Sequence, residues 1–191
     1  MSARRITLVF VLLEILIVVA GLALEGFSIS ALQTITRFSG RLSLLLFSAI
    51  FLLHQKPKIL HAWLSEKFYL LFAVVHGIHL FELLGYVYLS GVELIPIRLA
   101  GGFLAYALIF IMPFLSAYHA QGRLSLERFY LAQTFFLYYI WLIFFLTYLP
   151  RVQGKLPNAG GNYAEHVALL GWVSTMLGIK LAGLIQFKRK R

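Results

Sequence analysis

Cysteine and aspartate are both absent from this chain of 191 residues, and charged residues of any kind are scarce. Without cysteine the protein can form no disulfide, no iron–sulfur cluster and no thiolate-ligated haem. Charged residues make up 13% of the sequence and hydrophobic residues 61%, whereas soluble domains carry roughly 25% charged residues. A single core of this size cannot hide so much apolar surface from water. The composition therefore predicts an integral membrane protein.

Six apolar stretches are long enough, or nearly so, to cross a bilayer as helices of about 20 residues. They are residues 6–24, 38–53, 68–88, 99–118, 129–149 and 167–187. The second stretch is the shortest and contains Arg41 near one end. The segments between them carry glycine, proline and charge, and none could form a soluble domain. We therefore expect an all-α fold, with residues 1–191 forming a single six-helix transmembrane domain.

Lysine and arginine are distributed unevenly between the two ends of the expected helices. With the N-terminus in the cytoplasm, eleven of them face the cytoplasm and five face the opposite side, in line with the positive-inside rule. The eleven are Arg4, Arg5, Lys56, Lys58, Lys67, Arg123, Arg128 and the four of residues 188–191, and the five are Arg37, Arg41, Arg98, Arg151 and Lys155. Both termini are therefore predicted to be cytoplasmic, in a plasma or inner membrane.

The formal net charge of +10 does not indicate nucleic-acid binding, because the basic residues flank apolar stretches and form no basic–aromatic surface outside them. Membrane lipid is the expected partner, and residues 188–191 can also contact anionic headgroups. An alternative for the first stretch is a signal peptide cleaved near residues 20–23. The length of that stretch and Glu14 within it argue against this alternative.

The third stretch contains three ionisable residues, His76, His79 and Glu82. Counted from Lys67 at 1.5 Å per residue, His76 lies roughly 13 Å and His79 roughly 18 Å into the membrane. An ionisable side chain at such a depth costs roughly 2–3 kcal/mol, so it usually faces the protein interior, a cavity or a cofactor. Because imidazole can ligate haem iron, His76 and His79 are candidate cofactor-binding residues.

Two interpretations of this histidine pair remain open. The two residues are neighbours on one helix and cannot bind one iron from opposite faces, so a haem would need a non-histidine ligand, a vacant sixth position or a partner subunit's histidine. Otherwise both are interior histidines bonded to Gln133, Thr134 or a backbone carbonyl. In either case His76 should point into the bundle, where Gln133 and Tyr138 can face it.

A metal site formed by the His-x-x-His-x-x-Glu spacing is disfavoured, because only His79 lies near both of the other residues on a helix. No metal is therefore expected beyond a possible haem iron. Glu14 in the first stretch and Lys180 in the last both lie roughly 10–12 Å from the cytoplasmic edge. Either they form an ion pair between neighbouring helices, or Lys180 reaches the interface and Glu14 is protonated.

Three short motifs within residues 37–150 resemble ferric reductase-like transmembrane domains, a superfamily that includes NADPH oxidases and ferric reductases. They are Arg37-Phe-Ser-Gly40, Ala73-Val-Val-His76 and Pro113-Phe-Leu-Ser116. The resemblance implies a six-helix membrane domain that carries haem b and serves as the electron-transport subunit of an oxidoreductase. His76 matches a ligand position of that family.

The fifth stretch departs from this family, because residues 126–149 contain no histidine where the family has two. The two-haem path is therefore not implied, and at most one haem b, on His76 or His79, remains. No flavin or nucleotide domain follows, so a separate redox partner or quinol would supply electrons. The alternative functions are a haem-free, non-enzymatic scaffold or partner subunit, and a small transporter with Glu14, Glu82 and Lys180 as coupling groups.

Overall fold

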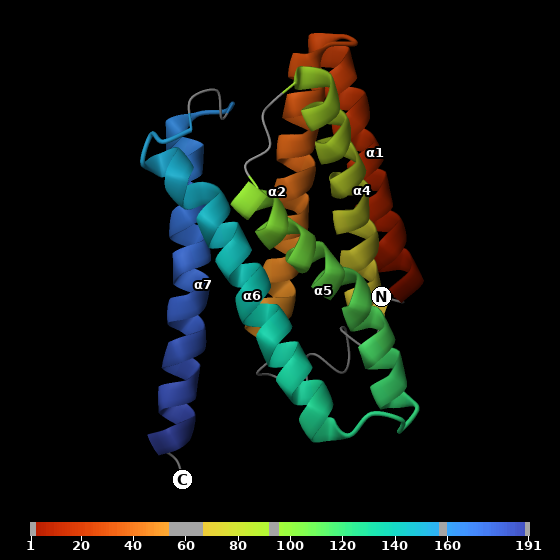
Figure 1. Cartoon of the computed structure of the whole chain (residues 1–191), viewed down its shortest axis with the longest axis vertical. Helices are drawn as coiled ribbons and strands as arrows, with labels where there is room; N and C mark the ends of the chain where they lie inside the picture. The colour runs from red at the N-terminus through yellow and green to blue at the C-terminus, as the bar shows by residue number, and fades with distance from the viewer. Residues whose placement is uncertain (1–2, 54–66, 92–95, 157–159, 190–191) are drawn as a thin grey trace.

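The computed structural model describes all residues except 1–2, 54–66, 92–95, 157–159 and 190–191. In the part that it describes, the regular elements are six α-helices (Figure 1). They are α1 (Ala3–Glu25), α2 (Ile29–Leu53), α4 (Lys67–Ser90), α5 (Pro96–Ala120), α6 (Leu126–Val152) and α7 (Tyr163–Arg189). All six are long and apolar enough to cross a membrane. The expected all-α, six-helix fold is confirmed, and the chain is a multi-pass membrane protein.

In five of the helices, both the first and the last residue lie within four residues of the predicted limits. The predicted start of the second helix is wrong. The helix α2 begins at Ile29, nine residues before the expected residue 38. Its first turns contain polar residues, so the apolar length of the sequence did not indicate that the helix begins there. These residues are accommodated because α2 is the most enclosed of the six candidate spans: Thr36 is buried, and Arg41 pairs with Glu165 of α7 at 2.6 Å. Arg37, which the sequence placed just before this helix, therefore lies inside it.

The helix α2 occupies the centre of the bundle. It packs against α1, α4 and, less extensively, α7, while α4, α5, α6 and α7 pack successively against one another. Figure 1 shows α1 and α7 at opposite edges of the molecule, with α2 between them. In the described part of the chain, no extensive contact joins the first helix to the last.

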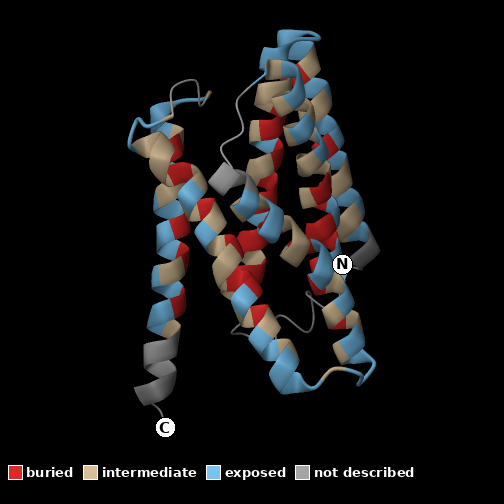
Figure 2. Cartoon of the chain, in the orientation of Figure 1, coloured by how far each residue is buried: buried red, intermediate tan, exposed pale blue. Residues whose placement is uncertain are grey.

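The core is a cluster of aromatic rings where α2, α4 and α6 meet. Phe47 and Phe51 of α2, Phe72 of α4 and Phe136 of α6 are fully buried. The Phe47 ring centroid lies 5.4 to 5.8 Å from those of Phe51, Phe72 and Phe144. Figure 2 shows buried residues on the inward sides of the helices and exposed residues on their outer faces. Since lipid is as apolar as these side chains, close packing must hold the helices together.

Six crossings place both termini on the same side of the membrane, and the excess of basic residues predicts that this side is cytoplasmic. A fluorescent reporter that folds only in the cytoplasm, fused after Arg191, is therefore expected to be active. A second reporter, active only after export, serves as the control. Activity of the exported reporter at the same fusion point would contradict this orientation.

Candidate functional site

Two acidic side chains from different helices meet at Ser39 inside the bundle. Ser39 of α2 is fully buried, and Glu14 of α1 is 2% exposed. The Ser39 hydroxyl donates a hydrogen bond to Glu14 Oε1 at 3.1 Å. It also adjoins Glu82 of α4, and the two carboxyl groups are close enough to interact electrostatically. We call Glu14, Ser39 and Glu82 the carboxyl cluster.

Small residues allow the three helices to converge at this point. A Cβ atom at Gly21 of α1 would lie 2.5 Å from Cγ1 of Ile35, so α1 and α2 cross closely there. A Cβ atom at Gly40 would lie 3.1 Å from Cε1 of His79, so a larger residue would push the imidazole away. Glycine at helix contacts has this effect throughout membrane proteins, because it lets backbones approach each other.

Several polar atoms in and beside the carboxyl cluster are buried without a hydrogen-bond partner. They are Oε2 of Glu14, both carboxyl oxygens of Glu82, and the hydroxyl oxygens of Thr36 and Ser43. A serine hydroxyl carries one hydrogen, so Ser39 cannot donate to both carboxyl groups at once. In a membrane interior an unpaired polar group costs several kcal/mol. The arrangement is therefore chemically suited to taking up a proton or another cation.

The two histidines continue the polar region along α4. The His79 ring lies within hydrogen-bonding reach of the Thr36 backbone carbonyl, while its Nδ1 is buried and unpartnered. We therefore assign the hydrogen to Nε2, which leaves Nδ1 able to accept a proton. The His76 ring lies 5.2 Å from that of His79 and points into the bundle, where it packs on Phe72 and Tyr106.

The residues that face His76 are not those expected from the sequence. Tyr106 of α5 and Phe144 of α6 lie next to it, with ring centroids 5.1 and 6.1 Å away. Gln133 instead donates a hydrogen bond to the hydroxyl of Tyr69, seven residues before His76 on α4. Because Gln133 is level with Tyr69, the part of α6 beyond Gln133 lies at the depth of His76, as the Phe144 contact shows.

The packing around His76 does not fit a haem. Phe72 and Tyr106 lie against the imidazole, and the Phe110 ring lies where Gly77 leaves room, 3.5 Å from the position of a Cβ atom. A porphyrin beside His76 would have to displace these rings. Within the described residues, no group of three or more histidine, cysteine or acidic side chains is placed to hold a metal ion.

The other histidines lie away from this region or outside the described residues. His119 contacts the Leu124 carbonyl at the turn after α5, and His166 contacts the Gly160 carbonyl at the start of α7. His54 and His61 fall outside the described residues.

Glu14 and Lys180 do not form the ion pair considered from the sequence. Lys180 Nζ donates to the Phe51 carbonyl at 3.4 Å and lies 4.0 Å from the Phe51 ring centroid. Glu14 is bonded to Ser39, which precedes Phe51 by twelve residues on α2, or roughly 18 Å of helix. Glu14 and Lys180 thus contact α2 on different sides and at different heights.

Polar contacts extend from the carboxyl cluster toward the upper end of the bundle in Figure 1. One turn beyond Glu82, the Tyr86 hydroxyl accepts a hydrogen bond from Gln33 at 2.9 Å. The Gln33 side chain in turn lies against Gly160, in the segment between α6 and α7. The sequence analysis missed Ser39, Thr36, Gln33 and Tyr86. For the three residues of α2, the signal was the polar face of residues 29–43, of which residues 29–37 lay outside the expected second stretch.

Toward the opposite end the polar contacts stop at an aromatic layer. Phe47, Phe72 and Phe136 are fully buried and lie between His76 and the hydrogen-bonded pair Tyr69–Gln133. The polar region therefore connects the membrane interior with one end of the bundle only.

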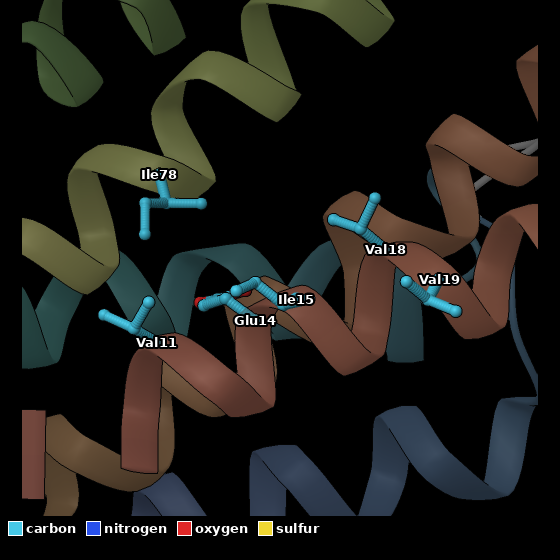
Figure 3. Close-up of a pocket in the computed structure, with 6 residues that line it drawn as sticks. All are labelled: Val11, Glu14, Ile15, Val18, Val19 and Ile78. Atoms are coloured by element: carbon cyan, nitrogen blue, oxygen red, sulfur yellow. The ribbon is translucent and has the colours of Figure 1, made fainter. Parts of the chain in front are cut away.

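A groove of about 210 Å³ runs over the outer side of Glu14, between α1 and α4 (Figure 3). The atoms exposed in this groove are all apolar, including those that Glu14 contributes. The lining residues are Val11, Glu14, Ile15, Val18, Val19 and Ile78. Ile78 of α4 faces the α1 side chains across it. The Glu14 carboxyl group is thus turned away from the groove and toward Ser39, consistent with its hydrogen bond.

Comparison with protein-family models, with curated proteins and with solved structures finds no match for this chain. No family is therefore assigned, and the resemblance to ferric reductase-like domains rests on its three short motifs alone. What the fold defines is the class, a six-helix multi-pass membrane protein.

Proposed function

We propose that this protein moves protons in the membrane and acts as a small proton transporter, with Glu14, Glu82 and His79 as its proton-binding groups. The observation that carries the proposal is the meeting of two carboxyl groups at Ser39, within one helical turn of an imidazole with an unpartnered nitrogen. Ionisable residues that face the interior of a membrane bundle usually mark ion pathways or proton relays. Lys180, a third coupling group considered from the sequence, lies too far away to take part.

The carboxyl cluster supplies the proton-binding step. Two ionised carboxylates next to each other in an apolar interior would be very costly, so at least one proton is held there whenever no other cation is present. Ser39 orients Glu14 by donating to one of its oxygens. Glu82 exchanges protons with the upper end through the region of Tyr86 and Gln33, whose side chains are hydrogen-bonded.

His79 and His76 are the next proton-binding groups in the proposed pathway. His79 lies three residues before Glu82, on the same side of α4, and its Nδ1 accepts a proton that Glu82 releases. His76 follows at a ring distance of 5.2 Å. Beyond His76 the phenylalanine layer blocks further transfer, so the helices must rearrange before the proton reaches the other side. Such one-sided access is typical of a transporter and not of an open channel.

Proton movement by the purified protein in liposomes tests this function. A pH gradient is imposed with sodium and potassium salts on both sides, and valinomycin carries compensating charge. The gradient is expected to dissipate several times faster than in protein-free liposomes. Glu127→Gln, at an exposed position in the first turn of α6, serves as the matched control and should behave like the wild type. A wild-type rate equal to that of protein-free liposomes would contradict the proposal.

An absorption spectrum of the same preparation distinguishes this function from the electron transfer implied by the resemblance. Electron transfer requires a haem, whose Soret band should disappear in His76→Ala and persist in His119→Ala. Such a result would replace the proton proposal. Protein that moves protons and shows no Soret band supports it, whereas colourless protein that moves no protons favours the scaffold alternative.

A further inference from the structure

We infer that the carboxyl cluster also binds a sodium ion, and that sodium and a proton compete for it. This inference rests on the proposed function, because it names the ion exchanged for the proton at the same site. The binding groups are Glu14, Ser39 and Glu82, together with the hydroxyl of Thr36, one turn before Ser39 on the same helix.

The cluster offers oxygen atoms that lack partners. Thr36 is 7% exposed and Ser43 is fully buried, and the hydroxyl oxygen of each has no hydrogen-bond partner. They lie three residues before and four residues after Ser39 on one face of α2, roughly 10 Å apart along the helix, so only one of them can join Ser39 at a single ion. We assign this place to Thr36. Oε2 of Glu14 and both oxygens of Glu82 are likewise buried and unpaired. A cation bound among these groups would be coordinated by several oxygen atoms that otherwise have no partner.

The ligand chemistry favours a hard ion. Carboxylate, hydroxyl and carbonyl oxygens suit hard cations, whereas transition metals favour imidazole and thiolate ligands. Mg²⁺ demands octahedral geometry and usually keeps several waters, which a site enclosed by three helices in a membrane does not readily hold. Ca²⁺ takes six to eight oxygen ligands, whereas Glu14, Glu82 and Thr36 together offer four unpaired oxygen atoms.

Charge balance is kept when a monovalent ion replaces one proton. One sodium ion and one proton neutralise the two carboxyl groups of Glu14 and Glu82, and so do two protons. When sodium binds, one proton leaves, and the charge of the cluster does not change. The same site can therefore carry sodium in one direction and a proton in the other without burying net charge.

Binding of radiolabelled sodium to the purified protein in detergent tests this inference independently of transport. Choline chloride keeps the ionic strength constant. Binding is expected to be saturable and to weaken as the pH falls, because protons occupy the same carboxyl groups. Glu14→Gln and Glu82→Gln should each lower the affinity about 10-fold or more, the range seen when metal sites lose supporting groups. Thr36→Val, which removes only the hydroxyl, should lower it less.

Glu127→Gln is again the matched control, and each variant is compared only where it elutes as a monodisperse species. Sodium affinity that is unaffected by Glu14→Gln and Glu82→Gln, or undetectable in the wild type, would overturn the sodium site while leaving proton movement untouched. Saturable, acid-sensitive binding that both substitutions remove would support the site, even if the liposomes show no proton movement. The two proposals can therefore fail separately.

Discussion

Glu82→Gln is expected to reduce proton movement in liposomes to the level of protein-free liposomes. Glutamine has nearly the same size and can still accept a hydrogen bond, but it has no dissociable proton. Glu82 adjoins Ser39 and lies between the polar contacts of the upper end and His79, so the substitution interrupts proton transfer without a large change in packing. The rate of dissipation of an imposed pH gradient measures the effect.

Glu14→Gln should have a similar effect, and the double variant should be no worse than either single variant. Both carboxyl groups share Ser39 and act as one proton-binding unit, and residues that act as a unit show strongly non-additive losses. Glu127→Gln should retain the wild-type rate. Partial losses that simply multiply in the double variant would show instead that Glu14 and Glu82 act independently.

Phe47→Ala is expected to destabilise the protein by about 3–5 kcal/mol, the usual cost of removing a fully buried phenylalanine. Phe47 has no exposed surface, and its ring contacts the rings of Phe51, Phe72 and Phe144. The substitution leaves a cavity at the meeting point of three helices, whose lining atoms lose their dispersion contacts. Reversible unfolding in mixed detergent micelles measures the change in free energy.

Phe103→Ala is the matched control for this measurement. Phe103 of α5 is 75% exposed in the bundle and faces outward, so its contacts are mostly with lipid or detergent. Its loss should change the free energy of unfolding by much less than the loss of Phe47. Equal effects of the two substitutions would mean that the aromatic cluster is not the stabilising core of this protein.

Composition and apolar length alone determined the class of this protein. The sequence contains runs of apolar residues that are long enough, as helices, to cross the membrane. Such runs form helices because lipid offers the backbone no hydrogen bonds. The five helices with clean apolar limits were predicted to within four residues. The start of α2 was predicted nine residues too late, because polar residues such as Gln33, Thr36 and Arg37 interrupt the apolar run, and the burial of Thr36 is known only from the structure.

Position along a helix also indicated which residues are deep in the membrane. His76, His79, Glu82 and Glu14 were recognised as interior groups because each lies far from the ends of its apolar stretch. That argument gives the depth within one helix. It does not give the direction in which a side chain points across the bundle, nor the offset between neighbouring helices.

Tertiary packing decided which of these groups meet. Glu14 and Glu82 come together only because α1 and α4 both pack on the small residues Ser39 and Gly40 of α2. Lys180, placed by the sequence at the same depth as Glu14, contacts Phe51 instead, because α7 packs on the other side of α2. The physical reason is that an apolar run of sufficient length inserts each helix into the membrane, whereas close packing between specific side chains determines which helices lie next to each other.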